Sequence, residues 1–133
     1  MKKLVQDVMT PKERLIIVTQ TATIRKVLKT LQEKNVKSVI VEKNSQNGAY
    51  GLLTYKNILQ SIIAEDGDID LLNAYDIMIS PTISVSRKLD VKYAAKMMVN
   101  SSIKRLLVID DNEIYGILTM TDIIEVLMES IDS

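Results

Sequence analysis

The 133-residue sequence contains no cysteine and no histidine. Without cysteine the chain has no disulfide and no thiolate chemistry. Without histidine it has neither histidine-ligated zinc nor a histidine general acid or base. Tryptophan and phenylalanine are absent too, and the aromatic residues are five tyrosines. Because apolar residues still make up 47% of the chain, we expect a core of Ile, Leu, Val, Met and Ala, with methionines at helical spacing as filler.

No excess of either charge is present, since 17 basic residues balance 17 acidic ones. Nonspecific nucleic-acid binding needs clustered excess cations, so we do not expect a nucleic-acid partner. No apolar run approaches the roughly 18 residues of a membrane span. The polar Gln6 and Asp7 come too soon after the start for a signal peptide. These features predict a soluble, cytoplasmic protein with no membrane partner.

Motifs that would indicate an enzyme are also missing. There is no glycine-rich phosphate loop of the G-x-x-x-x-G-K-[ST] type, and no nucleophile with an adjacent base. Asp110 and Asp111 fall in an expected turn, where we predict that they are solvated. We therefore expect no catalytic residues, no enzyme activity and no resident metal, since a metal would arrive only with a triphosphate ligand.

What the sequence does contain is one pattern that occurs twice. Gly51–Leu59 (GLLTYKNIL) recurs 65 residues later as Gly116–Ile124 (GILTMTDII), and Asp7–Pro11 (DVMTP) recurs as Asp76–Pro81 (DIMISP). A duplicated unit in a short chain predicts two similar halves that bury a face against each other. The predicted division has three parts, which are a first repeat at 1–64, an acidic linker at 65–74 and a second repeat at 75–133.

Each half is predicted to run strand, helix, strand, strand and helix. Short apolar or β-branched runs predict the strands. Apolar residues at helical spacing, behind a capping Thr23 or Asp90, predict the first helix of each half. In the first half the predicted elements are Leu15–Val18, Ile24–Leu31, Val36–Val41, Tyr50–Leu53 and Ile58–Ile63. Their counterparts in the second half are Thr82–Val85, Val91–Met98, Ile103–Ile109, Tyr115–Leu118 and Ile123–Met128.

This tandem order, with Gly-h-h-Thr-x-x-Asp (h, any apolar residue) before the last helix, resembles the CBS domain family, which is named after cystathionine β-synthase. The resemblance extends over roughly residues 5–130. In that family two repeats pair into the unit called a Bateman module. The resemblance implies an α/β (α+β) fold, in which two β-α-β-β-α repeats pack with pseudo-twofold symmetry through their small sheets.

The family binds adenosine-containing ligands in clefts between the paired repeats, and some members sense cell energy by this means. The resemblance therefore implies a regulatory module that binds AMP, ADP or ATP, with S-adenosylmethionine or NAD as further ligands. A free-standing pair implies an effect on a regulated protein partner or through oligomerisation, and the family usually forms homodimers through helices. The alternative is a ligand-independent dimerisation or interaction module, as in members that bind nothing detectable.

The segment Thr119–Asp122 lies at a predicted strand-to-helix junction, where backbone N–H groups attract phosphate. Two interpretations stay open. Thr-x-x-Asp is a capping-box pattern in which Asp stands in for Glu, worth about 1 kcal/mol. By resemblance, Asp122 accepts hydrogen bonds from two ribose hydroxyls, with Thr119 and Thr121 beside it. The same resemblance adds three adenosine contacts from the first repeat, which are Ile16, Val36 and Lys37.

Two cations, Lys104 and Arg105, stand at the start of a predicted strand. Arginine can bind a phosphate through two hydrogen bonds. The resemblance implies that role, and an exposed basic pair is the alternative. The resemblance also implies a second, weaker site, formed by Thr54, Asn57, Ser80, Ile83 and Ile103 together with Lys104. Asn57 stands where the pattern has Asp, and the lost charge-assisted hydrogen bond costs about 1–2 kcal/mol, near tenfold in affinity.

Overall fold

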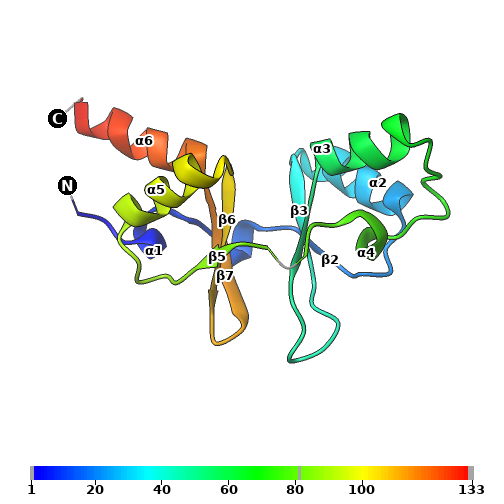
Figure 1. Ribbon diagram of the computed structural model, residues 1–133, viewed down its shortest axis with the longest axis horizontal. Coiled ribbons are helices and arrows are strands. Elements are labelled where there is room, and N and C mark those ends of the chain that lie inside the picture. Colours follow the sequence, from blue (N-terminus) through cyan, green and yellow to red (C-terminus); the bar gives the residue numbers. More distant parts are fainter. Residues whose placement is uncertain (1, 81, 132–133) are drawn as a thin grey trace. The chain divides into compact units, whose positions relative to one another are not determined.

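The computed structural model describes residues 2–80 and 82–131 and contains two compact units (Figure 1). The first 15 residues cluster with residues 83 onward, and we call this the terminal unit. Residues 16–82 form the other cluster, the central unit. The units therefore cut across the duplication, because the opening of the first repeat packs with the second repeat.

The central unit is built on a three-stranded sheet of order β2-β3-β4, formed by β2 (Ile17–Val18), β3 (Ser38–Val41) and β4 (Gly51–Thr54). β2 runs parallel to β3, which runs antiparallel to β4. The parallel pair is connected by α2 (Ile24–Lys34), which begins where the Thr23 hydroxyl accepts the Lys26 N–H at 3.2 Å. This bond confirms the predicted cap, and α2 ends at Asn35 in the left-handed conformation.

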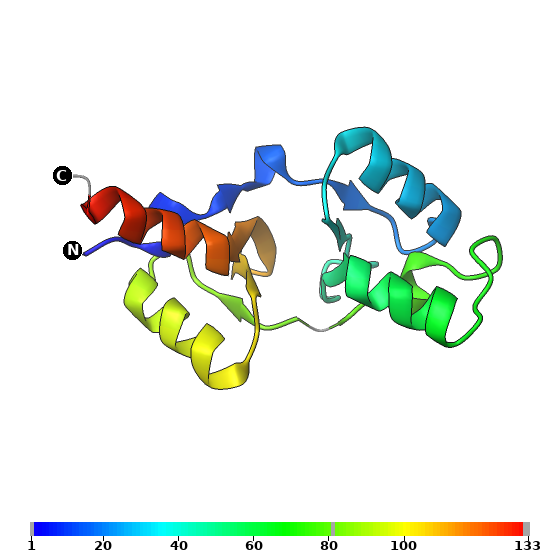
Figure 2. The ribbon, with the colours of Figure 1, turned by 90° about the horizontal axis from the view of Figure 1, so that it is seen from above.

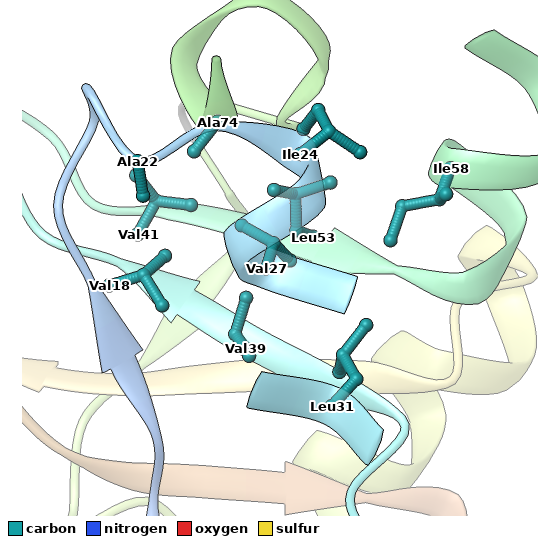
Figure 3. Packing of buried hydrophobic residues seen from close by; sticks show 10 residues of the cluster. All are labelled: Val18, Ala22, Ile24, Val27, Leu31, Val39, Val41, Leu53, Ile58 and Ala74. Atoms are coloured by element: carbon teal, nitrogen blue, oxygen red, sulfur yellow. The ribbon is translucent and has the colours of Figure 1, made fainter. Parts of the chain in front are cut away.

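The central unit contains a buried cluster of aliphatic side chains (Figure 3). The ten residues of this cluster come from all parts of the unit and are Val18, Ala22, Ile24, Val27, Leu31, Val39, Val41, Leu53, Ile58 and Ala74. Ile69 and Leu72, both in the predicted linker, pack against this core. Arg25 of α2 forms an ion pair with Asp70 at 2.6 Å. The acidic segment is thus attached to the unit, and α4 (Ala74–Ile77) follows it directly.

The second helix of the first half changes its winding partway along. α3 (Tyr55–Ile58) continues into the π-helical segment η2 (Leu59–Ala64). The Glu65 N–H bonds to the Gln60 carbonyl, five residues earlier, at 3.0 Å. Hydrophobic spacing predicted a helix here, but an apolar period near 3.6 residues carries no information about such a local widening.

The terminal unit has a four-stranded sheet of order β1-β7-β6-β5, formed by β1 (Thr10–Pro11), β5 (Ser84–Val85), β6 (Arg105–Asp110) and β7 (Glu113–Thr119). β5 is parallel to β6, and the other two pairs are antiparallel. Asp111 and Asn112 both have positive φ and form the two-residue turn between β6 and β7, as favoured in tight hairpins. A short 3₁₀ turn, η1 (Lys12–Arg14), follows β1.

Two helices, α5 (Val91–Ser101) and α6 (Met120–Ile131), lie side by side in the terminal unit (Figures 1 and 2). The Asp90 carboxylate accepts the Lys92 N–H at 2.9 Å, which confirms the predicted cap of α5. The short helix α1 (Val5–Val8) contacts both helices, and its Val5 N–H donates to the carbonyl of Leu89, just before α5, at 2.8 Å. The element order predicted for both halves is therefore confirmed.

The prediction that Asp110 is solvated is wrong. Its Oδ2 accepts hydrogen bonds from Arg87 Nε at 2.8 Å and from the Arg87 backbone N–H at 3.1 Å. The Arg87 guanidinium also lies over the ring of Tyr115, 3.8 Å from its centroid. The sequence gives no sign of this cluster, because its cation lies 23 residues before its acid. Asp111 is exposed, as predicted.

Some methionines predicted to fill the core lie at the surface. Met98 is buried, but Met120 is 40% exposed and Met128 is 56% exposed. α6 also exposes Ile124 and Leu127, two apolar residues of the predicted last helix. Apolar residues cover two sides of α6, and only the side that carries the buried Val126 packs on its own unit.

Candidate functional site

A groove in the terminal unit has a volume of about 540 Å³. We call it the α6 groove, and its lining residues are Lys104, Arg105, Thr119, Met120, Thr121, Ile124, Glu125 and Met128. The strand ladder explains how distant residues meet here, because Arg105 at the start of β6 pairs with Thr119 at the end of β7. The Met120 N–H donates to the Lys104 carbonyl at 3.0 Å, and this hydrogen bond holds the start of α6 beside the start of β6. Four predicted site residues, including Thr121, therefore line one groove.

The α6 groove is basic at one end and apolar along its length. Lys104 and Arg105 have no ion-pair partner among the described residues, and Glu125 is the one acid in the lining. Met120, Ile124 and Met128 follow one another at intervals of four residues along α6 and supply the apolar surface. Two cations beside a water-accessible apolar surface can bind an anionic group attached to a ring or another apolar body.

Asp122 caps α6 rather than lining this groove. The Thr119 N–H donates to Asp122 Oδ2 at 2.9 Å, and the Asp122 N–H donates to Thr119 Oγ1 at 3.1 Å. These reciprocal bonds are the capping box that the sequence pattern predicted. The second carboxylate oxygen, Oδ1, makes no hydrogen bond within the part of the chain that the structure describes. The cap therefore leaves Oδ1 of Asp122 as an unused hydrogen-bond acceptor. The predicted ribose contact stays a prediction.

The equivalent position in the central unit carries Asn57. Its Oδ1 accepts the Thr54 N–H at 3.0 Å and the Thr54 hydroxyl at 2.8 Å. Ser38 pairs with Thr54 in the ladder, just where Arg105 pairs with Thr119 in the other unit. The central unit therefore has the same cap, with a serine at the position that Arg105 occupies in the terminal unit.

The remaining predicted site residues divide between the two units. The central unit holds Ile16, Val36 and Lys37 along with Ser80, whose hydroxyl donates to the Tyr50 carbonyl at 3.1 Å. The terminal unit holds two more of the predicted residues, the exposed Ile83 and the half-buried Ile103. The assembly of residues from both repeats into shared sites stays a prediction.

Sequence reasoning missed half of the groove lining. Glu125 attracted no attention, and Met120 lies just before the predicted final helix. Met128 was interpreted as core filler, and Ile124 was named only as part of the predicted last helix. A usable signal was present, because a surface helix usually has one apolar stripe, and α6 has apolar residues at too many positions for one stripe.

Comparisons with known proteins agree with this architecture. The family model described as the CBS domain matches residues 5–64 and 74–129. An uncharacterised protein of Methanopyrus kandleri is 32% identical over 107 residues, which are 80% of this chain and 54% of that protein. The chain thus spans about half the length of the curated relative it matches.

Two solved structures show the same fold. A hexameric CBS-CP12 protein from bloom-forming cyanobacteria is 28% identical, with a TM-score of 0.81 over 92% of this chain and 69% of that one. CBSX2, a CBS-pair protein from Arabidopsis thaliana, is 23% identical in its complex with AMP, with a TM-score of 0.78 over 95% of this chain and 96% of that one. The predicted α/β fold with two small mixed sheets is confirmed.

Proposed function

The chain belongs to the CBS domain family, and from this premise we propose that it is a regulatory module that binds an adenine nucleotide. CBS pairs are non-catalytic modules, in agreement with the prediction that this chain is not an enzyme. The ligand class proposed is AMP, ADP or ATP, with S-adenosylmethionine or NAD as further candidates. The related CBSX2 binds AMP, which supports the class but not the choice within it.

The observation that carries this proposal is the convergence of Lys104 and Arg105 with Thr119 and Thr121 in one groove. Neither cation is neutralised by an acid among the described residues, so both charges are available to a phosphate. The Asp122 carboxylate caps α6 with only one of its oxygens, and the other oxygen can accept hydrogen bonds from ribose hydroxyls. The ligand contacts implied for Ile16, Val36 and Lys37 stay predictions.

Signalling in this proposal works through packing. Bound nucleotide changes how the module packs with a second copy or a regulated protein, and it does so only by its difference in affinity between the two arrangements. The exposed apolar side of α6 supports a homodimer, since Leu127 and Ile131 are 55% and 80% exposed. No helix within residues 2–80 and 82–131 is long and apolar enough to cross a membrane, and we propose a cytoplasmic location.

The second candidate function is a ligand-independent dimerisation or interaction module. The same exposed side of α6 favours it, because that surface needs a protein partner and no nucleotide. The related CBS-CP12 protein is a hexamer. The two functions differ in one measurable respect, which is whether a nucleotide stabilises the fold.

Thermal denaturation with AMP, ADP, ATP, S-adenosylmethionine and NAD tests the proposal. A ligand at a hundredfold excess over its Kd stabilises the folded state by about 2.7 kcal/mol. Arg105→Ala is expected to weaken binding at least tenfold, because a charge-assisted hydrogen bond contributes roughly 1.5–3 kcal/mol. Lys88→Ala is the matched control, since Lys88 is an exposed cation of the same unit outside the groove. Unchanged melting with all five ligands would contradict the proposal and favour the second function.

A further inference from the structure

Glu125 is the one acid among the described residues that line the α6 groove, and it shares this lining with two cations, Lys104 and Arg105. It is exposed, and within residues 2–80 and 82–131 it forms no ion pair with either cation. The carboxylate therefore presents its full negative charge to a molecule that enters the groove, and the cations present their positive charges to the same molecule.

Helix geometry places Glu125 one turn beyond the cationic end of the groove. That end lies at the start of α6, because Arg105 pairs with Thr119, the last residue before the helix. Thr121 lines the same end, and Glu125 follows it by four residues. Residues four apart lie on one side of a helix, about 6 Å from each other along its axis. A phosphate held at the cationic end would therefore lie within reach of the Glu125 charge.

A carboxylate at this distance acts on an anionic ligand without touching it. The Debye length is about 8 Å at physiological ionic strength, so a separation of about 6 Å leaves the repulsion only partly screened. With the dielectric constant of water, the screened repulsion lowers affinity roughly twofold for each unit of negative charge on the ligand. The penalty from Glu125 therefore rises with the number of phosphates.

The two cations of the groove match the charge of a single phosphate. A phosphate monoester carries about −1.5 to −2 charges at pH 7, and each further phosphate adds about one more. No third cation lines the groove within the described part of the chain. Size does not make the same distinction, because a groove of about 540 Å³ lies well inside the range of roughly 300–1,000 Å³ found for small-molecule sites.

We propose that Glu125 determines the phosphate specificity of the α6 groove, so that a nucleoside monophosphate binds more tightly than a metal-free triphosphate. This inference rests on the proposed nucleotide-binding function and narrows its ligand class. Magnesium binds to nucleotide phosphates, and its two positive charges cancel two of the negative charges of a triphosphate. The preference for the monophosphate is therefore largest when magnesium is absent.

Titration calorimetry of wild type and Glu125→Gln, with AMP and with ATP in the presence of EDTA, tests this assignment. Glutamine keeps the shape of the side chain and removes its charge. The variant is expected to bind AMP about fourfold more tightly and metal-free ATP more than about tenfold more tightly, because ATP carries about twice the charge. With excess magnesium chloride in place of EDTA, the gain for ATP is expected to fall to that for AMP.

Glu129→Gln is the matched control. Glu129 is an exposed acid one turn further along α6 and outside the groove lining. It lies about 12 Å along the helix from Thr121, beyond the Debye length, so its removal is expected to change either affinity less than about twofold. Glu125→Ala removes the same charge and provides a second variant if Glu125→Gln does not fold.

Equal gains for AMP and metal-free ATP in the Glu125 variants, no gain for either, or a loss of ATP affinity would overturn the inference. A wild-type chain that binds metal-free ATP more tightly than AMP would do the same. In each of these cases a nucleotide still binds, so the proposed function survives. Wild type and variants that bind neither nucleotide would end both proposals.

Discussion

The thioether of Met9 lies against Gly116, so close that a β-carbon at Gly116 would come within 2.8 Å of the sulfur. The same β-carbon would also overlap the Thr10 carbonyl, because β1 pairs with β7 at this point. The central unit repeats the arrangement with Met78 packed on Gly51. Met9 and Met78, each from the duplicated segment near the start of its repeat, thus pack on the hairpin glycine of the other repeat.

Gly116→Ala should destabilise the chain because the added methyl group has no room. The atoms it meets include backbone, which cannot move without breaking the β1–β7 pairing. Overpacking of this kind costs about 1–3 kcal/mol. Urea denaturation of the variant measures the loss. Gly48→Ala is the control, since the two nearest atoms there are side-chain ends in a loop, and a change under about 0.5 kcal/mol is expected. Equal losses in both variants would contradict the close approach at Gly116.

The Arg87–Asp110 cluster should make stability depend on pH. Hydrogen bonding from the Arg87 backbone, with further bonds from the Ser86 and Arg87 side chains, holds the pKa of Asp110 below its ordinary value. A carboxyl group whose pKa is lowered by folding stabilises the protein above its unfolded pKa and loses that contribution as pH falls through the folded value. Asp110→Asn is therefore expected to melt below wild type at pH 7, with a gap that narrows below about pH 4.

Asp111→Asn is the control for this measurement. Asp111 is the exposed neighbour in the same turn, and asparagine tolerates its positive φ. Its melting temperature should follow wild type across the whole pH range. A gap between Asp110→Asn and wild type that stays constant down to pH 3 would mean that the Asp110 charge contributes nothing to stability.

The cap at Asp122 gives a prediction about stability that is separate from binding. Asp122→Ala removes the acceptor for the Thr119 N–H and is expected to cost about 1 kcal/mol. Asp122→Asn keeps an acceptor oxygen, as Asn57 does in the first repeat, and should cost less. Guanidinium denaturation of the three proteins in the absence of nucleotide provides the comparison. Equal stability of the Ala variant and wild type would show that the cap is energetically unimportant.

A charge on the exposed side of α6 should weaken self-association. Leu127 is 55% exposed and lies outside the α6 groove, so Leu127→Glu tests the apolar surface without touching the proposed nucleotide site. Sedimentation velocity should show a dimer for wild type and a shift toward monomer for the variant, because the carboxylate would be buried without a partner. Asn100→Glu adds the same charge at an exposed polar position of α5 and should leave the dimer intact. A monomeric wild type would contradict the expected homodimer.

Local features of this fold were predictable from sequence because their causes are local. Thr23 and Asp90 cap their helices through neighbours two or three residues away, and the pattern contains both partners. The Asp122 cap was predictable for the same reason. Half of the α6 groove was recognised in advance, since Lys104 and Arg105 stand out as adjacent cations.

Features that depend on distant partners were not predictable. The duplication revealed that Met9 and Gly116 belong to repeated motifs, but not that the motif of one repeat packs on the glycine of the other. Asp110 looked solvated because its partner, Arg87, lies on another loop. Met120 is the clearest case in the groove, since whether an apolar side chain faces its own core or solvent depends on which side of the helix packs.

The packing of the first segment of each repeat on the other repeat has a consequence for synthesis on the ribosome. Residues 16–82 are contiguous, so the central unit can assemble as soon as they have emerged. The first 15 residues leave the tunnel earlier still, yet the surface that receives them is made from residue 83 onward. Val5 and Met9 therefore cannot complete their packing until β7 has been translated, so the segment that precedes the central unit in the chain folds after it.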